Sequence, residues 1–212
     1  MNIFVLDFET TGLNPYLNEP IEIAIKKLNK RQNFQSLIIP SENNIHYKYI
    51  PPEIVELTNI TDSMIDIDGV DKYTVIFNVC KFLETNTNED SPIYILSHNG
   101  NSFDFLIFRK LIYDYNKNHD YDKIESTFID RIKYIDTILV SKLFIKNEKL
   151  NQPRLCQKYN IHNNNEHRAY GDILALEQLY EKLCEQYSHK NGFSYNHYID
   201  NPEDILENIH CN

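Results

Sequence analysis

Two acidic residues near the start of the chain, Asp7 and Glu9, have a spacing that suits metal chemistry. They lie in the run IFVLDFETTGL, residues 3–13, which has apolar residues on both faces when it is read as a β-strand. Carboxylates two residues apart on a strand share a face, with Cα atoms about 6–7 Å apart. They can share one divalent cation or bridge two cations about 3.5–4 Å apart, as in two-metal phosphoryl-transfer sites. Taken alone, the pair is better explained as a strand that ends in two solvated acids, because short acidic motifs recur by chance.

Two further acids, Asp104 and Asp172, each lead the apolar face of an expected helix. The apolar positions behind them are Phe108, Leu111 and Tyr115, and Leu176, Leu179 and Leu183. Each acid alone could be a helix cap or the partner of a base such as Arg109 or Arg168. Four inward acids from three segments would repel one another and destabilise the fold unless a cation lies among them. Such an all-oxygen set favours Mg²⁺ or Mn²⁺ over zinc.

His167 lies five residues before Asp172, a separation of about 140° on a helix, so the two would not share a helical face. We therefore expect His167 in the loop or first turn that leads into the helix, close to the acids. A histidine there can take a proton from water near neutral pH. The alternative is a surface histidine, because the residue belongs to the polar run HNNNEH.

The elements that would position these residues alternate as in an α/β domain, with antiparallel strands that lead into a mixed sheet. The carboxyl ends of strands in an open sheet are where ligands bind. The first strand, with apolar residues on both faces, is expected to be central. The other strands are expected at residues 21–25, 34–39, 93–96 and 132–135, with a hairpin turn at 29–33 and helices at 51–58, 71–83, 104–115, 137–144 and 169–187.

Composition and charge bound the function. The length of 212 residues suits one domain, and 31 acidic against 21 basic residues give a net charge of −10. That balance argues against a protein that coats duplex DNA, but not against a nuclease that binds a short single-stranded end. With only 5 glycines, the chain has no glycine-rich phosphate loop. The scattered asparagines indicate composition bias more than a structural pattern.

The four cysteines, the N-terminus and the hydropathy indicate the compartment. Cys80, Cys156, Cys184 and Cys211 form no C-x-x-C pair, which argues against a zinc ribbon or a disulfide scaffold and suits a reducing compartment. No signal peptide and no apolar run of membrane-spanning length is evident. We therefore expect a soluble intracellular protein, cytoplasmic or nuclear, without membrane contact. The chain could also form a homodimer.

Three motifs, taken in order, resemble those of the DnaQ-like DEDDh 3′–5′ exonucleases of the RNase H-like superfamily. They are DFETTGL with Asp7 and Glu9, SHNGNSFDF with Asp104, and HRAYGDILAL with His167 and Asp172. The form of the second and third motifs looks most like the TREX group of three-prime repair exonucleases. The match runs from residue 3 to about 183, and Asn59 stands where glycine is usual.

The resemblance implies a fold and a site. The fold would be an RNase H-like mixed five-stranded sheet flanked by helices in an exonuclease domain of residues 1–190. A short tail, 191–212, would follow, with a small helix from Asn201-Pro202-Glu203. Asp7, Glu9 and Asp172 would bind one Mg²⁺ or Mn²⁺, and Asp7 with Asp104 a second. His167 would deprotonate the attacking water.

The resemblance also implies substrate contacts near the end of the first strand and in the second motif. Main-chain groups near Thr10 would recognise the terminal 3′-hydroxyl, and Leu13 would wedge against the last base. Leu13 and Phe103 fit ordinary core residues equally well. The full set of expected substrate-binding residues is Thr10, Thr11, Gly12, Leu13, Asn99 and Phe103.

The activity implied is metal-dependent 3′–5′ hydrolysis of single-stranded DNA ends with release of nucleoside monophosphates, as in DNA repair. One alternative is an exoribonuclease with the same site, in the manner of oligoribonuclease-like or RNase T-like enzymes, because sugar choice depends on the fit around the 2′-position. Another alternative is a nucleic-acid-binding module that kept the fold and lost the chemistry. The intact set of four acids and His167 counts against that module.

Overall fold

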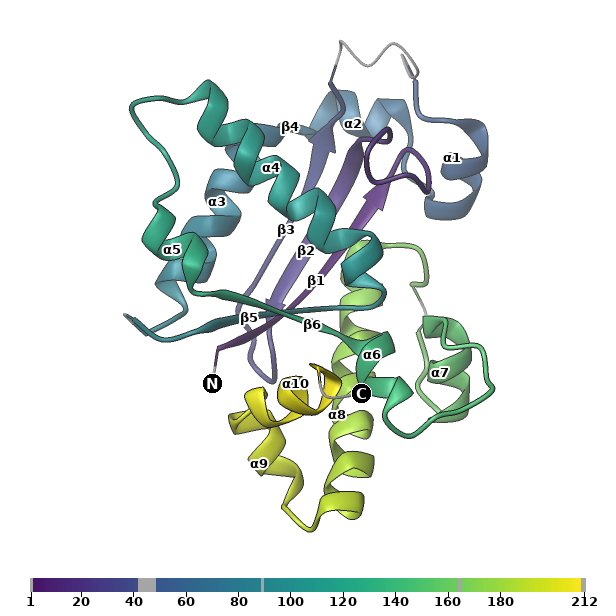
Figure 1. The fold of residues 1–212 in the computed structure, drawn as a ribbon. Helices are drawn as coiled ribbons and strands as arrows, with labels where there is room; N and C mark the ends of the chain where they lie inside the picture. Colours follow the sequence, from purple (N-terminus) through teal and green to yellow (C-terminus); the bar gives the residue numbers. More distant parts are fainter. Residues whose placement is uncertain (1, 42–48, 89, 164, 211–212) are drawn as a thin grey trace.

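The computed structural model describes residues 2–41, 49–88, 90–163 and 165–210. Within these residues one mixed sheet of six strands has the order β4-β3-β2-β1-β5-β6 (Figure 1). The strands β1–β3 are antiparallel, whereas β5 and β6 continue the sheet in parallel, which confirms the expected topology. The strands are β1 Ile3–Thr10, β2 Pro20–Lys27, β3 Asn33–Ile39, β4 Val70–Asp71, β5 Ile93–Ser97 and β6 Ile132–Asp136.

The sixth strand, β4, departs from the five that the sequence indicated. It has two residues and pairs in parallel with the end of β3. A segment this short has no periodicity to read, and Asp71 reads more readily as the start of the next helix. Asp71 does cap that helix, since its carboxylate accepts the backbone N–H groups of Tyr73 and Thr74, each at 3.0 Å.

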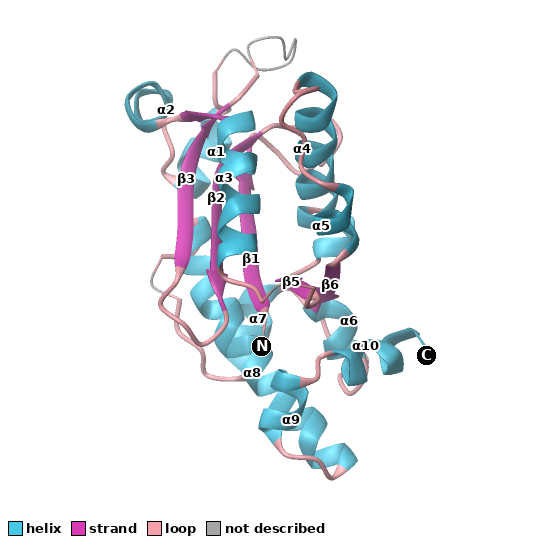
Figure 2. Cartoon of the chain, turned by 90° about the vertical axis from the view of Figure 1, so that its left-hand side faces the viewer, coloured by secondary structure: helices cyan, strands magenta, loops and turns pink. Residues whose placement is uncertain are grey.

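Helices cover both faces of the sheet. The helices α3 and α4 pack on one face, and α8 packs on the other against β1 and β2, while α9 lies at the opposite end of the molecule from α2 (Figure 2). The helices are α1 Pro52–Thr58, α2 Asp62–Asp68, α3 Lys72–Thr85, α4 Asp104–Asn118, α5 Ser126–Asp130, α6 Thr137–Lys142, α7 Gln152–Lys158, α8 Ala169–Asn191, α9 Tyr195–Asp200 and α10 Glu203–His210, with a 3₁₀ turn at Gly100–Ser102.

Strand β1 divides the core because successive side chains point to opposite faces. Ile3 and Val5 belong to the cluster around α8, whereas Phe4, Leu6 and Phe8 belong to the cluster around α3 and α4. All five are buried. The alternation continues beyond Leu6. The side chains at the odd-numbered positions after it therefore point to the face of the sheet that α8 covers, at the carboxyl end of the strand.

The remaining helices depart in detail from the sequence expectation. The polar segments that contain α5, α7 and α9 were not expected to be helical, because five- to seven-residue helices carry too few turns for an apolar stripe. The helix α8 runs to Asn191, beyond 187, and α6 ends at Lys142, before 144. In the tail, α10 starts at Glu203 as expected, and Tyr198, Ile199 and Ile205 are buried in the α8 core, so the tail packs as part of the same unit.

Asparagine has a structural role that the composition did not reveal. Five asparagines adopt the left-handed conformation with φ between 56° and 60°, at turns where glycine is common. The interpretation as composition bias more than a structural pattern therefore missed the turn role of these five residues. The five positions are Asn29, Asn59, Asn99, Asn147 and Asn160.

The structure agrees in part with the expectations drawn from the cysteines and the hydropathy. Cys80, Cys156 and Cys184 are buried free thiols, and Cys211 lies outside the described residues. Burial raises the pKa of Cys156 to about 11, so that thiol stays protonated at neutral pH. Among the described residues, no helix has both the length and the apolar character needed to cross a bilayer.

Candidate active site

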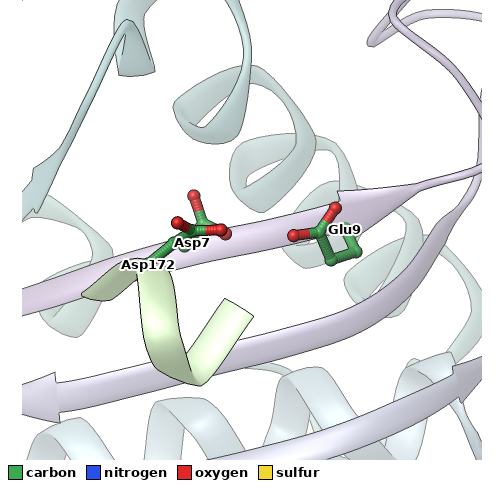
Figure 3. Close-up of side chains that lie close together, drawn as sticks. All are labelled: Asp7, Glu9 and Asp172. Carbon is green, nitrogen blue, oxygen red and sulfur yellow. The ribbon is translucent and has the colours of Figure 1, made fainter. Parts of the chain in front are cut away.

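Strand β1 and helix α8 bring three acids together (Figure 3). Asp7 and Glu9 continue the face of β1 that is packed against α8, and Asp172 lies in the first turn of that helix. One carboxylate oxygen from each residue lies within 4.8 Å of the others. The expected convergence of Asp7, Glu9 and Asp172 is thus present, on two elements that are more than 160 residues apart in the sequence.

Asp104 approaches the same region from the other face of the sheet, at a point where one edge of β1 is unpaired. Strand β5 pairs with β1 only as far as Val5, so the backbone of β1 beyond that point has no strand beside it on this edge. Asp104 Oδ1 accepts the backbone N–H of Phe8 at 3.1 Å, and Oδ2 accepts the hydroxyl of Ser97 at 2.7 Å. The carboxylate is 3% exposed and lines the same cavity as the other acids, but does not belong to the three-oxygen group.

Burial and neighbouring carboxylates disfavour the charged form of the four acids. Burial, then the charges of Asp104 and Glu9, raise the pKa of Asp7 well above its ordinary value. Burial and the charge of Asp172 raise the pKa of Glu9 from 4.5 to about 8. Burial is also the main cause that raises the pKa of Asp104 to about 7 and that of Asp172 to about 6. A divalent cation would offset this repulsion.

The donor chemistry of the group fits a hard cation. The three converging ligands are carboxylate oxygens alone, which is the set that Mg²⁺ and Mn²⁺ prefer and that zinc sites rarely use. Two of the three residues are on a strand and one is on the helix packed against it, so the group is held by the core rather than by a loop.

His167 lies in the loop directly before α8, as expected, and lines the cavity. Its φ of 63° is left-handed, which is uncommon for a residue other than glycine or asparagine and is typical of functional sites. The backbone N–H of His167 donates to Asp172 Oδ2 at 3.0 Å, and Asn163 Nδ2 donates to Oδ1 at 2.7 Å. The carboxylate of Asp172 therefore holds the loop that contains His167, and it also faces the other acids.

The acids and His167 line one cavity of about 800 Å³. Thr10, Gly12, Leu13, Asn99 and Phe103 also line it, as a substrate-binding role would require. Helices α1 and α7 supply further walls through residues such as Leu57 and Gln152. The volume lies within the range of about 300–1,000 Å³ that is usual for small-molecule pockets.

Three of the expected substrate contacts, Thr11, Leu13 and Phe103, differ in their exposure and packing. Thr11 is 2% exposed and does not line the cavity; its N–H donates to the carbonyl of Glu19, and its hydroxyl accepts the N–H of Glu19 at 3.0 Å. The N–H and the hydroxyl oxygen of Thr11 therefore have partners within the loop, and its substrate contact stays a prediction. Leu13 is 89% exposed, so the alternative of a core residue is excluded for it, whereas Phe103 packs partly against the core.

Two residues that support the site, Asp136 and Glu22, were missed in the sequence. Asp136 caps α6, as expected, but it also accepts the N–H groups of Asn99 and Asn101, each at 3.1 Å, and so fixes the loop before Asp104. Glu22 is a buried acid in a strand whose residues are almost all buried, and it binds Arg168. An acid within an otherwise apolar strand is unusual, and this could have identified Glu22 from the sequence. Nothing in the sequence linked Asp136 to a loop more than 30 residues earlier.

The comparisons with known proteins agree with this geometry. A family model described as Exonuclease (RNase T) matches residues 4–180. The PolC-type DNA polymerase III of Thermotoga petrophila is 28% identical over 206 residues, which is 96% of this chain and 13% of that protein. The epsilon subunit of DNA polymerase III from Buchnera aphidicola is 31% identical over 189 residues, 84% of this chain and 67% of that protein.

Solved structures show the same fold. E. coli Exonuclease I in complex with a dT13 oligonucleotide has a TM-score of 0.68 and 16% identity, and the match covers 89% of this chain and 42% of that one. The chain spans only about an eighth of the PolC-type relative. These relatives do not confirm a particular closeness to the TREX group. Together with the site, they show that the chain belongs to the DnaQ-like 3′–5′ exonuclease family.

Proposed function

We propose that this chain is a metal-dependent 3′–5′ exonuclease that removes nucleoside monophosphates from single-stranded 3′ ends of DNA. The observation that carries the proposal is the convergence of Asp7, Glu9 and Asp172 within 4.8 Å, with Asp104 buried beside them. Mutual repulsion of this kind destabilises a fold, and a resident cation is the simplest compensation.

The acids divide into two sets of ligands. Asp7, Glu9 and Asp172 would hold one Mg²⁺ or Mn²⁺, and Asp7 with Asp104 would hold a second. Asp104 can serve although it accepts two hydrogen bonds, because each carboxylate oxygen has a further lone pair. When bound, such cations acidify the attacking water and stabilise the charge on the phosphate and the leaving 3′-oxygen.

The protein side chains supply the proton transfer and the orientation. His167 takes the proton from the attacking water, and its loop is held by the hydrogen bond from its N–H to Asp172. The main chain around Thr10 and Gly12 would receive the terminal 3′-hydroxyl. Leu13, which projects into solvent at the cavity, would wedge against the last base, and the Phe103 ring would stack on a base.

The choice of DNA is supported by the relatives. Exonuclease I is seen with dT13 and dA16 oligonucleotides, and the polymerase III relatives are DNA polymerase proteins. An exoribonuclease with the same site is the second candidate. An inactive binding module is disfavoured, because it would gain nothing from four clustered carboxylates whose pKa values are all raised.

The test is hydrolysis of a 5′-labelled single-stranded oligonucleotide with Mg²⁺, as DNA and RNA of the same sequence in parallel. We expect a ladder that shortens from the 3′ end, faster on DNA, and no products in EDTA. A substrate with a blocked 3′-hydroxyl is the control for direction. Faster cleavage of RNA would favour the exoribonuclease, and intact substrate in every arm would refute nuclease activity.

A further inference from the structure

Glu22, on β2, is a further acid at the edge of the site, and it is buried. It lies directly opposite Glu9 in the antiparallel pairing of β1 and β2, and the residue is 6% exposed. Like charges directly opposite each other on neighbouring strands are destabilising. The charge of Glu22 indeed contributes to the raised pKa of Glu9. An acid at this position therefore needs a compensating partner and a reason to be there.

Arg168 is that partner, and it lies between His167 and the start of α8. Arg168 donates from Nε to Glu22 Oε2 at 3.2 Å and from a terminal nitrogen to Oε1 at 2.6 Å. The backbone N–H of Ala169 donates to Oε2 at 3.0 Å. Arg168 is the N-cap residue of α8 and provides no side-chain cap of its own. Glu22 thus caps the first turn of α8 from another element.

We propose that Glu22 and Arg168 are a positioning pair for the hydrolysis proposed above, and the inference rests on that function. Their bridge anchors the first turn of α8 to β2, and this keeps His167 and Asp172 in place relative to the acids of β1. Arg168 also neutralises Glu22, so the acid provides a cap without adding a net charge to the metal group. Neither residue contacts the reacting atoms in this account.

A second ion pair between β2 and α8 is a control that distinguishes a positioning role from a general contribution to stability. Lys26, four residues further along β2, binds Glu177 on α8, with 2.6 Å between Nζ and Oε1. Both side chains are nearly as buried as Glu22, and the polarity is reversed, with the base on the strand. Each pair ties β2 to α8, but only the Glu22–Arg168 pair adjoins the histidine loop.

Two other roles are less consistent with the contacts. Glu22 is not a member of the three-oxygen group, and both of its oxygens are already bound by Arg168 and Ala169. A metal-ligand role would require those bonds to break. The guanidinium of Arg168 is 37% exposed, so direct contact with a substrate phosphate is an outcome that the test must distinguish.

The experiment compares Glu22→Gln, Arg168→Gln and the double variant with Lys26→Gln as the matched control. The first readout is kcat and KM on labelled single-stranded DNA, and the second is hydrogen exchange of residues 165–172 in the metal-free protein. A glutamine at position 22 keeps the size and one acceptor oxygen but loses the charge. Thermal unfolding of each variant reports whether the fold is retained.

We expect kcat to fall by about tenfold or more in Glu22→Gln and in Arg168→Gln, with KM little changed, because small displacements of catalytic groups are costly. The double variant should be no worse than the poorer single one, since the pair acts as a unit. Lys26→Gln should lose stability but keep its kcat. Exchange of residues 165–172 should be faster in Glu22→Gln than in Lys26→Gln.

Three results would overturn the inference. They are a wild-type kcat in Glu22→Gln, an equal loss of kcat in Lys26→Gln, and a raised KM confined to Arg168→Gln, which would indicate phosphate contact. Failure of the proposed function looks different, because the wild type itself would cleave neither DNA nor RNA. The exchange measurement still decides in that case, since equal exchange in the Glu22 and Lys26 variants would refute an anchor at the start of α8.

Discussion

The carboxylate of Asp104 accepts the backbone N–H of Phe8 at 3.1 Å, and this bond ties the start of α4 to β1 at the candidate active site. Alternate backbone groups of a strand face the same neighbour, and the carbonyl of Asn2 on this edge accepts an N–H from β5. Phe8, six residues later, directs its N–H to the same edge after β5 has ended its pairing. The side chain of Asp104 therefore occupies the position that a longer β5 would take.

Replacement of Asp104 by asparagine should preserve the fold and abolish turnover. The amide oxygen can still accept the N–H of Phe8, and the amide nitrogen can donate to Ser97, but the negative charge that completes the second ion site is lost. We expect kcat to fall by roughly a thousandfold, about 4 kcal/mol of transition-state stabilisation. Steady-state kinetics with circular dichroism checks this, and an active, folded variant would remove Asp104 from the mechanism.

The metal-free protein should lose stability as the pH rises. Glu9 has its pKa raised from 4.5 to about 8, and Asp104 and Asp172 have theirs raised to about 7 and about 6. The folded state therefore holds more protons than the unfolded state in this window. The contribution of these groups to the free energy of unfolding is fully present below about pH 4. It is lost as the pH rises towards about 8.

The variant Glu9→Gln tests this linkage against the wild type in EDTA. At pH 8.5 we expect the variant to be more stable to urea by about 2 kcal/mol, because it lacks one buried charge, and at pH 5 the two should be nearly equal. Saturating Mg²⁺ should stabilise the wild type at pH 8.5 by about 2.7 kcal/mol at a hundred times Kd. A wild type that gains stability from pH 5 to pH 8 without metal would contradict the proposed repulsion among the site carboxylates.

Replacement of His167 by alanine should slow hydrolysis without loss of metal. A positioned general base contributes about a hundredfold to ten-thousandfold, so kcat should fall within that range. Calorimetry should find Mn²⁺ affinity close to that of the wild type, and an unchanged kcat would show that another group is the base.

Asn59 should tolerate glycine but not alanine. It ends α1 with φ 57° and ψ 15°, and the same helix contributes Leu57 to the cavity. Alanine in this left-handed conformation costs roughly 1–2 kcal/mol, whereas glycine has no such penalty. Urea unfolding of Asn59→Ala and Asn59→Gly checks the difference, and equal stabilities of the two variants would contradict a left-handed penalty at this turn.

The site acids could be predicted because their sequence context is local. Asp7 and Glu9 are two residues apart on one strand, and Asp104 and Asp172 each begin an apolar helical stripe. Periodicity alone places such residues on a face. The order of strands and helices then brought the three segments to one edge of the sheet, as the structure confirms for the topology.

The contacts that support those acids could not be predicted in the same way. Glu22 meets Arg168 across 146 residues, and Asp136 receives N–H groups from a loop 35 and 37 residues before it. Such contacts depend on tertiary packing and leave no periodic pattern. The left-handed asparagines were missed for a different reason, since asparagine occurs in many conformations and only its φ reveals the role.

Uptake of Mn²⁺ by the metal-free protein at pH 8, measured by titration calorimetry, tests the central claim most directly. The wild type should bind two ions per chain, and Asp7→Asn, which lacks the carboxylate shared by both sites, should bind neither tightly. A wild type that takes up no Mn²⁺ or Mg²⁺, or an Asp7→Asn variant with undiminished uptake, would contradict the claim that these carboxylates form a metal site.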